Sequence, residues 1–287
     1  MKKTISELKN VTRRETIAML ASAGIFSLPG IKIFQSDIDS NINKLAGKMK
    51  DSINRNSTLQ TIGILGGVGP QATMDLEMRI HNVAQQLLPA AQNTGYPPMV
   101  VQYYRHAPVL LTQTHQPLIP LQLDPRLLEV AKRLGSMADF LLLPSNGLHM
   151  FQKEIEHVSG RKIISMIDAT LEEVRTRGWK KAGVLGLMNP IVYTTRLKNL
   201  GIAFETIDVA LQEKLNQSIF KVMEGRENDV DATIALEAIR QLRNKNVDGI
   251  IPGCTEIPFL LGPNMDAKDL LNPAQLLAEA AVRYSIG

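Results

Sequence analysis

The fold of this chain is indicated by one stretch, VDGIIPGCTEIP, which spans residues 247–258. It is typical of a short apolar strand that ends in a polar turn, and the turn holds Cys254, the only cysteine of 287 residues. A thiol at the carboxyl end of an α/β strand faces the crevice in which such folds bind ligands. Backbone N–H groups of the turn are expected to lower the pKa of this thiol and so favour the reactive thiolate. A buried structural thiol is the alternative, but the polar neighbours Thr255 and Glu256 favour a functional one.

A second stretch, ADFLLLPSN at residues 138–146, repeats this plan. Asp139 precedes Ser145 by six positions, as Asp248 precedes Cys254. The glycine-bounded strands at 63–66 and 183–186, each followed by a proline four residues later, form another matched pair in the same order. Chance similarity between short apolar strands is the alternative. The two pairs predict a duplicated α/β chain.

The predicted fold is therefore α/β, with two similar domains that each hold a mostly parallel sheet flanked by helices. Duplicated halves usually face one another about a pseudo-twofold axis. This arrangement would place Ser145 and Cys254 on opposite walls of one cleft between the domains.

From about Leu59 to Gly287 the chain resembles the aspartate/glutamate racemase superfamily of cofactor-independent amino-acid racemases. Residues 62–73, IGILGGVGPQAT, resemble the first strand and glycine loop of that family, and 253–256, GCTE, match its second catalytic motif. Residues 144–149, PSNGLH, resemble the first motif, which usually reads Pro-Cys-Asn-Thr-x-His. This sequence departs from it at Ser145, which replaces the first catalytic cysteine, and at Gly147, which replaces the threonine.

The resemblance implies a cofactor-independent racemase or epimerase of an acidic amino acid or related carboxylate. Cys254 would act as acid and base, with Ser145 on the opposite face of the substrate. The resemblance, the glycine loop and the strand ends together suggest the remaining site residues. The expected substrate-binding residues are Gly67, Val68, Asn146, Gly147, Thr255 and Arg105, and the supporting residues are His149 and Glu256. The last helix of the family packs back on the first domain, so residues 59–166 plus 272–287 form the first predicted domain and 167–271 the second.

The chemistry requires a base on each face of the α-carbon. Cys254 can serve on one face, but the Ser145 hydroxyl is a weak base unless another group activates it. His149 is the candidate activator; it could instead orient the loop or be a structural histidine. Arg105 follows the second strand and could hold a carboxylate in a bidentate pair, or be a solvated surface residue.

The glycine loop also fits the G-x-G-x-x-A pattern of dinucleotide-binding folds at residues 67–72. That pattern requires an acidic residue at the end of the second strand, where this chain reads QYYR at 102–105. We therefore expect the glycines to allow close approach of a small carboxylate to helix N–H groups, or to form only a tight turn.

Two other functions compete with racemisation. One is a one-thiol carboxylate enzyme similar to arylmalonate-type decarboxylases, which keep the second cysteine and lack the first. The other is a non-catalytic amino-acid-binding protein of the cell envelope. The intact GCTE motif favours an enzyme, Ser145 favours the one-thiol enzyme, and Asn146 favours the racemase.

The composition and charge of the chain limit the kinds of partner that it is expected to bind. Residues 1–30 carry +3 of the net charge of +4, so the body is nearly neutral and indicates no nucleic-acid partner. No motif indicates a metal site, and one cysteine excludes an internal disulfide framework.

Arg13 and Arg14 before a weakly apolar stretch resemble a twin-arginine export signal over residues 1–35, which predicts a periplasmic or envelope location rather than a cytoplasmic one. A polar linker at 36–58 follows. No stable membrane span is expected, and a homodimer is left open.

Periodicity predicts alternating strands and helices in the body. Strands are expected at 61–65, 98–103, 140–143, 162–166, 182–185, 203–207 and 249–251, and helices at 73–88, 124–134, 170–178, 231–242 and 274–284.

Overall fold

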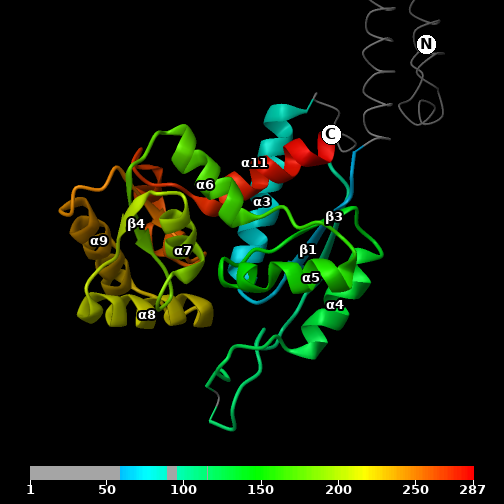
Figure 1. Cartoon of the computed structure of the whole chain (residues 1–287), viewed down its shortest axis with the longest axis horizontal. Coiled ribbons are helices and arrows are strands. Elements are labelled where there is room, and N and C mark those ends of the chain that lie inside the picture. The colour runs from blue at the N-terminus through cyan, green and yellow to red at the C-terminus, as the bar shows by residue number, and fades with distance from the viewer. Residues whose placement is uncertain (1–58, 89–95, 115) are drawn as a thin grey trace, which may run out of the picture. The chain divides into compact units, whose positions relative to one another are not determined.

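The computed structural model describes residues 59–88, 96–114 and 116–287. The predicted export signal and linker lie outside these residues. The described residues belong to one compact unit, and its elements are shown in Figure 1. In the described ranges, no helix combines the length and the apolar character that crossing a bilayer requires.

Two parallel three-stranded sheets form the centre of the fold. The first contains β1 (Ile62–Gly66), β2 (Met99–Tyr103) and β3 (Phe140–Leu142) in the order β2-β1-β3. The second contains β4 (Lys181–Leu185), β5 (Ala203–Glu205) and β6 (Gly249–Pro252) in the order β5-β4-β6. In each sheet the first strand is central and the third leads into a motif loop, so the predicted α/β fold class is confirmed.

The repeated aspartates have the same structural role in the two sheets. The Asp139 carboxylate accepts the Thr61 N–H at 2.7 Å, and the Asp248 carboxylate accepts the Lys180 and Lys181 N–H groups at 2.6 and 2.8 Å. Each aspartate therefore ties the start of its own strand to the start of the central strand. The repeat noticed in the sequence reflects this shared register.

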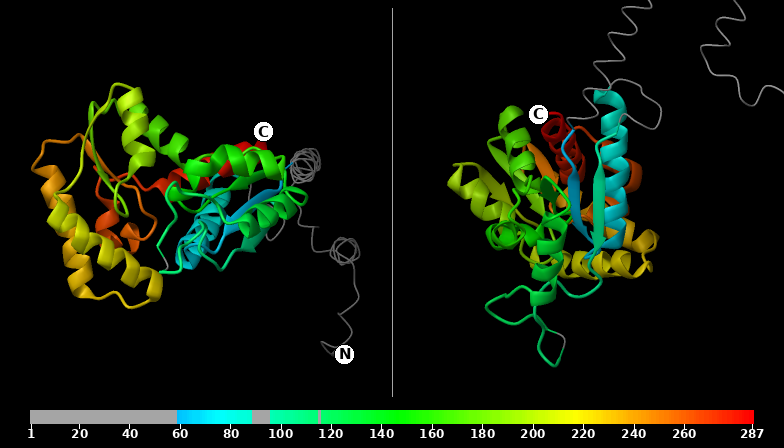
Figure 2. Two further views of the ribbon diagram at one scale, coloured as in Figure 1. Left: turned by 60° about the horizontal axis from the view of Figure 1, so that its bottom comes forward. Right: turned by 90° about the vertical axis from the view of Figure 1, so that its right-hand side faces the viewer.

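Helices cover both faces of each sheet (Figures 1 and 2). On the first sheet, α3 (Pro70–Leu87) and α11 (Pro273–Ile286) share one apolar cluster, and α4 (Pro125–Gly135) and α5 (Gln152–Ser159) lie in the cluster on the other face. On the second sheet, α8 (Val209–Glu224), α9 (Asp229–Arg243) and α10 (Ile257–Leu261) cover one face. The other face is covered by α6 (Met166–Thr176) and α7 (Ile191–Asn199).

The last helix crosses back to the first sheet. Leu277, Ala278 and Ala281 of α11 are buried in the same cluster as Ile62 and Ile64 of β1. The Gln60 N–H donates to the Ser285 carbonyl at 2.9 Å, which ties the end of α11 to the start of β1. The proposed domain boundaries fall in the first turn of α6 and just before α11, and we retain them as a proposal.

The strand expected at 162–166 is wrong. Only an isolated parallel bridge between Leu141 and Ile163 forms there. Ser165 is the N-cap of α6, and its hydroxyl accepts the Asp168 N–H at 3.2 Å. The helix therefore begins at Met166, four residues before its predicted start, because a serine cap satisfies one of the unpaired N–H groups of the first turn. The pattern also missed α5, α7, α8 and α10, as well as the 3₁₀ segments η2 (Gly147–Phe151) and η3 (Gly262–Asp266).

Candidate active site

The loop after β6 is held close to the central strand β4. The Gly253 N–H donates to the Leu185 carbonyl at 2.8 Å. A Cβ at position 253 would lie 2.7 Å from that carbonyl oxygen and 2.9 Å from the Tyr193 ring. Only glycine fits this approach, which fixes where Cys254 emerges from the sheet.

Cys254 is buried, with 8% of its surface exposed, and its Sγ donates to Glu256 Oε2 at 3.0 Å. Burial raises the pKa of the Cys254 thiol well above its ordinary value, and the nearby charge of Glu256 raises it further. N–H groups of Glu256 and Leu187 act in the opposite direction but are outweighed. The turn N–H of Glu256 thus lowers the thiol pKa as expected, but the net shift is upward because burial and a neighbouring carboxylate both disfavour the thiolate.

Glu256 links the two halves of the unit. Its buried carboxylate accepts from the Cys254 thiol and from the Thr255 hydroxyl, each at 3.0 Å from Oε2. The other oxygen, Oε1, would lie 2.7 Å from a Cβ at Gly69, which is the N-cap of α3. A side chain at position 69 would displace this carboxylate, so the glycine loop and the GCTE motif are adjacent in space.

The glycine loop is shaped by its own hydrogen bonds. Gly67 has φ +89°, and a Cβ there would lie 2.6 Å from the Tyr104 backbone nitrogen. The Gly67 N–H donates to Thr73 Oγ1 at 2.9 Å, so this donor is already used within the protein. Val68 packs against the apolar cluster around α4. The conformation of Gly67 and the packing of Val68 therefore explain why these two residues occur in the loop.

His149 is held by two backbone groups. The Met166 N–H donates to Nε2 at 3.1 Å, so the ring proton lies on Nδ1, which donates to the Ser145 carbonyl at 2.9 Å. Burial lowers the pKa of His149 to about 4. Since both ring nitrogens are engaged, His149 orients the loop, as one of the alternatives stated, and neither nitrogen is available to the Ser145 hydroxyl. That hydroxyl forms no hydrogen bond with any residue that the structure describes.

Asn146 and Gly147 differ in their surroundings. Asn146 is 4% exposed; its Oδ1 accepts from the Tyr193 hydroxyl at 2.7 Å, and its buried Nδ2 has no acceptor among the described residues. A Cβ at Gly147 would meet nothing within 4 Å. No sequence pattern pointed to Tyr193, because a single tyrosine between apolar residues is typical of core packing.

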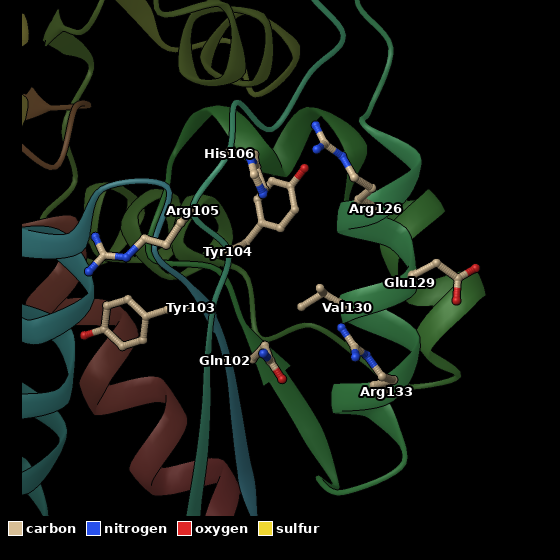
Figure 3. A pocket seen from close by; sticks show the side chains of 9 residues that line it. All are labelled: Gln102, Tyr103, Tyr104, Arg105, His106, Arg126, Glu129, Val130 and Arg133. Carbon is tan, nitrogen blue, oxygen red and sulfur yellow. The ribbon is translucent and has the colours of Figure 1, made fainter.

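Arg105 lies at a separate hollow. Its guanidinium is 5.1 Å from the centre of the Tyr103 ring. It is one of nine residues around a cavity of about 540 Å³ at the end of β2 and along α4. Figure 3 shows Arg105 directed toward Tyr103, whereas Arg126 and Arg133 extend from α4. The cavity lining includes neither Ser145 nor Cys254, so the structure does not bring Arg105 together with the two motif loops at this cavity.

Known proteins that resemble this chain identify its family. The family model described as Asp/Glu/Hydantoin racemase matches residues 65–281. A broad specificity amino-acid racemase, RacX of Bacillus subtilis (strain 168), is 26% identical over 226 residues, which cover 77% of this chain and 96% of the relative.

Solved structures share the fold. An aspartate racemase homologue from Pyrococcus horikoshii OT3 has a TM-score of 0.61 and 19% identity, over 79% of this chain and 99% of that one. The Picrophilus torridus aspartate racemase has a TM-score of 0.60 and 21% identity, over 79% and 94% of the two chains. Because the family model spans most of the chain, the resemblance seen in the motifs is confirmed, and this chain belongs to the Asp/Glu/hydantoin racemase family of isomerases.

Proposed function

We propose that this protein is a cofactor-independent racemase or epimerase of an acidic amino acid or related carboxylate, with Cys254 as the acid and base on one face. The observation that carries the proposal is the buried thiol that donates to Glu256 at the carboxyl end of β6. Amino acids are favoured as the substrate class because the curated relative is an amino-acid racemase that covers most of the chain.

Glu256 would activate the thiol. Transfer of the Sγ proton to Oε2 gives a thiolate beside a neutral carboxylic acid, and the thiolate can then remove the substrate α-proton. The S–H and carboxylate groups carry one negative charge before and after this transfer. The step therefore moves a charge between neighbouring atoms and does not create a separated pair, which burial would penalise strongly. The resulting thiol can return its proton to the carbanion on the same face.

The opposite face of the substrate, on the Ser145 side, has a weaker base. A hydroxyl is a weak base without an activating partner, and both nitrogens of His149 are engaged by backbone groups. Proton delivery from the Ser145 face would therefore be slow or use water. We expect exchange of the α-proton with solvent to be faster than racemisation.

The same observation favours a second candidate, a one-thiol carboxylate enzyme. In that reaction the substrate loses CO₂, and Cys254 protonates the carbanion that remains. No base on the Ser145 side is needed.

One experiment separates these functions. The purified protein is incubated in D₂O with a panel of L- and D-amino acids, and α-deuteration is followed by NMR and enantiomer composition by chiral chromatography. A parallel set of disubstituted malonates is assayed for CO₂ release. Deuteration of an amino acid that requires Cys254 supports the racemase, whereas CO₂ release from a malonate without deuteration of any amino acid supports the decarboxylase. Absence of both reactions across the two panels contradicts both proposals.

Export by the twin-arginine route remains a separate proposal, and its residues lie outside the described part of the structure. It is supported by Arg13 and Arg14 ahead of the weakly apolar stretch. Replacement of both by Lys should retain the protein in the cytoplasm, as judged by cell fractionation. A wholly cytoplasmic unmodified protein would contradict the proposal.

A further inference from the structure

Tyr193 lies between the two motif loops. It belongs to α7 and is fully buried. Its ring packs against Gly253, the neighbour of Cys254, and its hydroxyl lies 2.7 Å from Asn146 Oδ1. One side chain from the second half therefore contacts both strand-end loops.

The hydrogen-bond geometry fixes the orientation of the amide. A separation of 2.7 Å is usual for O–H···O and short for N–H···O, which supports donation by the tyrosine to the amide oxygen. The alternative acceptor, Thr170 Oγ1, is 3.4 Å away. Thr170 donates its own proton to the Met166 carbonyl at 2.8 Å. It can therefore only accept from Tyr193, and at its longer distance it competes poorly with Asn146 Oδ1 for the tyrosine proton.

This orientation leaves one donor group unused. Asn146 Nδ2 is buried and has no acceptor among the described residues. A buried donor without an acceptor is destabilising, and buried polar groups in native proteins are rarely left in this state. Such a group in a strand-end loop indicates that a ligand supplies the acceptor.

We infer that Tyr193 is a positioning residue that presents the Asn146 N–H groups, and not its carbonyl, to the substrate. Asn146 would then bind a carboxylate oxygen, which accepts hydrogen bonds, and not the ammonium group, which only donates them. The inference rests on the proposed function for the nature of the substrate. The resemblance already implies that Asn146 binds substrate; the inference goes beyond it by adding Tyr193 as the residue that fixes the orientation of this amide.

Tyr193→Phe is the informative variant, because it keeps the ring against Gly253 and removes only the hydroxyl. We expect the KM for α-proton exchange to rise about tenfold, the effect of one net hydrogen bond, while kcat changes less. Asn146→Ala should raise KM at least as much, and adding Tyr193→Phe to it should have no further effect. Thr170→Val is the matched control; it also contacts the hydroxyl but not the amide, and its KM should stay near that of the wild type. Thermal unfolding checks that each variant folds.

Binding of succinate, which has carboxylates and no amino group, gives a readout that does not depend on turnover. By calorimetry, both Tyr193→Phe and Asn146→Ala should weaken it about tenfold and Thr170→Val should not. Equal affinities in the wild type and Tyr193→Phe, or no succinate binding by the wild type, would overturn the inference. If succinate binding follows the expected pattern but no amino acid exchanges its α-proton, the proposed function fails and the assignment of Asn146 stands.

Discussion

The loop after β3 and the loop after β6 occupy matching places in two sheets of the same strand order, yet their side chains differ in chemistry. In the β6 loop, Cys254 donates to a carboxylate that can take its proton. In the β3 loop, Ser145 lies beside a histidine whose two nitrogens are held by backbone groups. The two halves thus share their strand order, whereas the chemistry of their loops differs.

This contrast indicates where each half contributes. Asp139 and Asp248 tie their strands in the same way, so register is common to both halves. In the mechanism we propose, the acid and base function lies in the second half, and the first half supplies the buried Asn146 amide. Variants of the two loops should therefore differ in the size and kind of their effects.

The largest effect is expected from Cys254→Ser. If the thiol transfers the α-proton, exchange in D₂O should fall by about 10³-fold or more, within the usual range for loss of an acid–base group. Circular dichroism and thermal unfolding should show an intact fold, and substrate should protect the wild-type thiol from alkylation. Full activity of the serine variant would remove Cys254 from the mechanism.

Glu256→Gln should have the next largest effect, a loss of about 10²-fold in exchange, because the buried thiol can no longer pass its proton to an adjacent carboxylate and take it back during each turnover. The same change removes a negative charge that raises the Cys254 pKa. Alkylation by iodoacetamide at a fixed pH of about 8 should therefore become faster, since more thiolate forms. Slower turnover with unchanged or slower alkylation would indicate that Glu256 has another role.

Ser145→Cys tests the weaker side of the comparison directly. A thiol on that face should raise racemisation about tenfold or more relative to exchange, because a thiolate is a far better base than an unassisted hydroxyl. Chiral chromatography and deuterium incorporation measure the two rates in one sample. The gain should disappear in the Ser145→Cys, Cys254→Ser double variant. An unchanged ratio would mean that position 145 does not face the reacting carbon.

The smallest effect concerns His149 and appears in stability. Burial lowers its pKa from 6.5 to about 4, so between these values the unfolded chain binds a proton that the folded protein does not. Stability should consequently fall as pH decreases from 6.5 toward 4, by about 2 kcal/mol between pH 7.5 and 5. Urea unfolding at both pH values should show this slope in the wild type and a flatter one in His149→Gln. Equal slopes would show that the histidine is not buried in its neutral form.

Local sequence patterns predicted much of the framework. Apolar runs bounded by glycine and proline identified β1, β3, β4 and β6, and Asp124 before Pro125 marked the start of α4. The pattern failed at residues 162–166, where a serine cap and a single bridge replaced the expected strand. A short apolar run alone does not show whether a neighbouring strand is available to pair with it.

The sequence by itself determined the α/β class, the duplicated order of strands and the positions of Ser145 and Cys254 at strand ends, because these depend on residues close together along the chain. Only the tertiary structure decided the state of the groups in those loops. The Cys254 pKa depends on burial, the nitrogens of His149 on the Met166 backbone, and the Asn146 amide on a tyrosine 47 positions away. Protonation and hydrogen bonding depend on which groups are near in space and on how much water is excluded, and no local pattern encodes either.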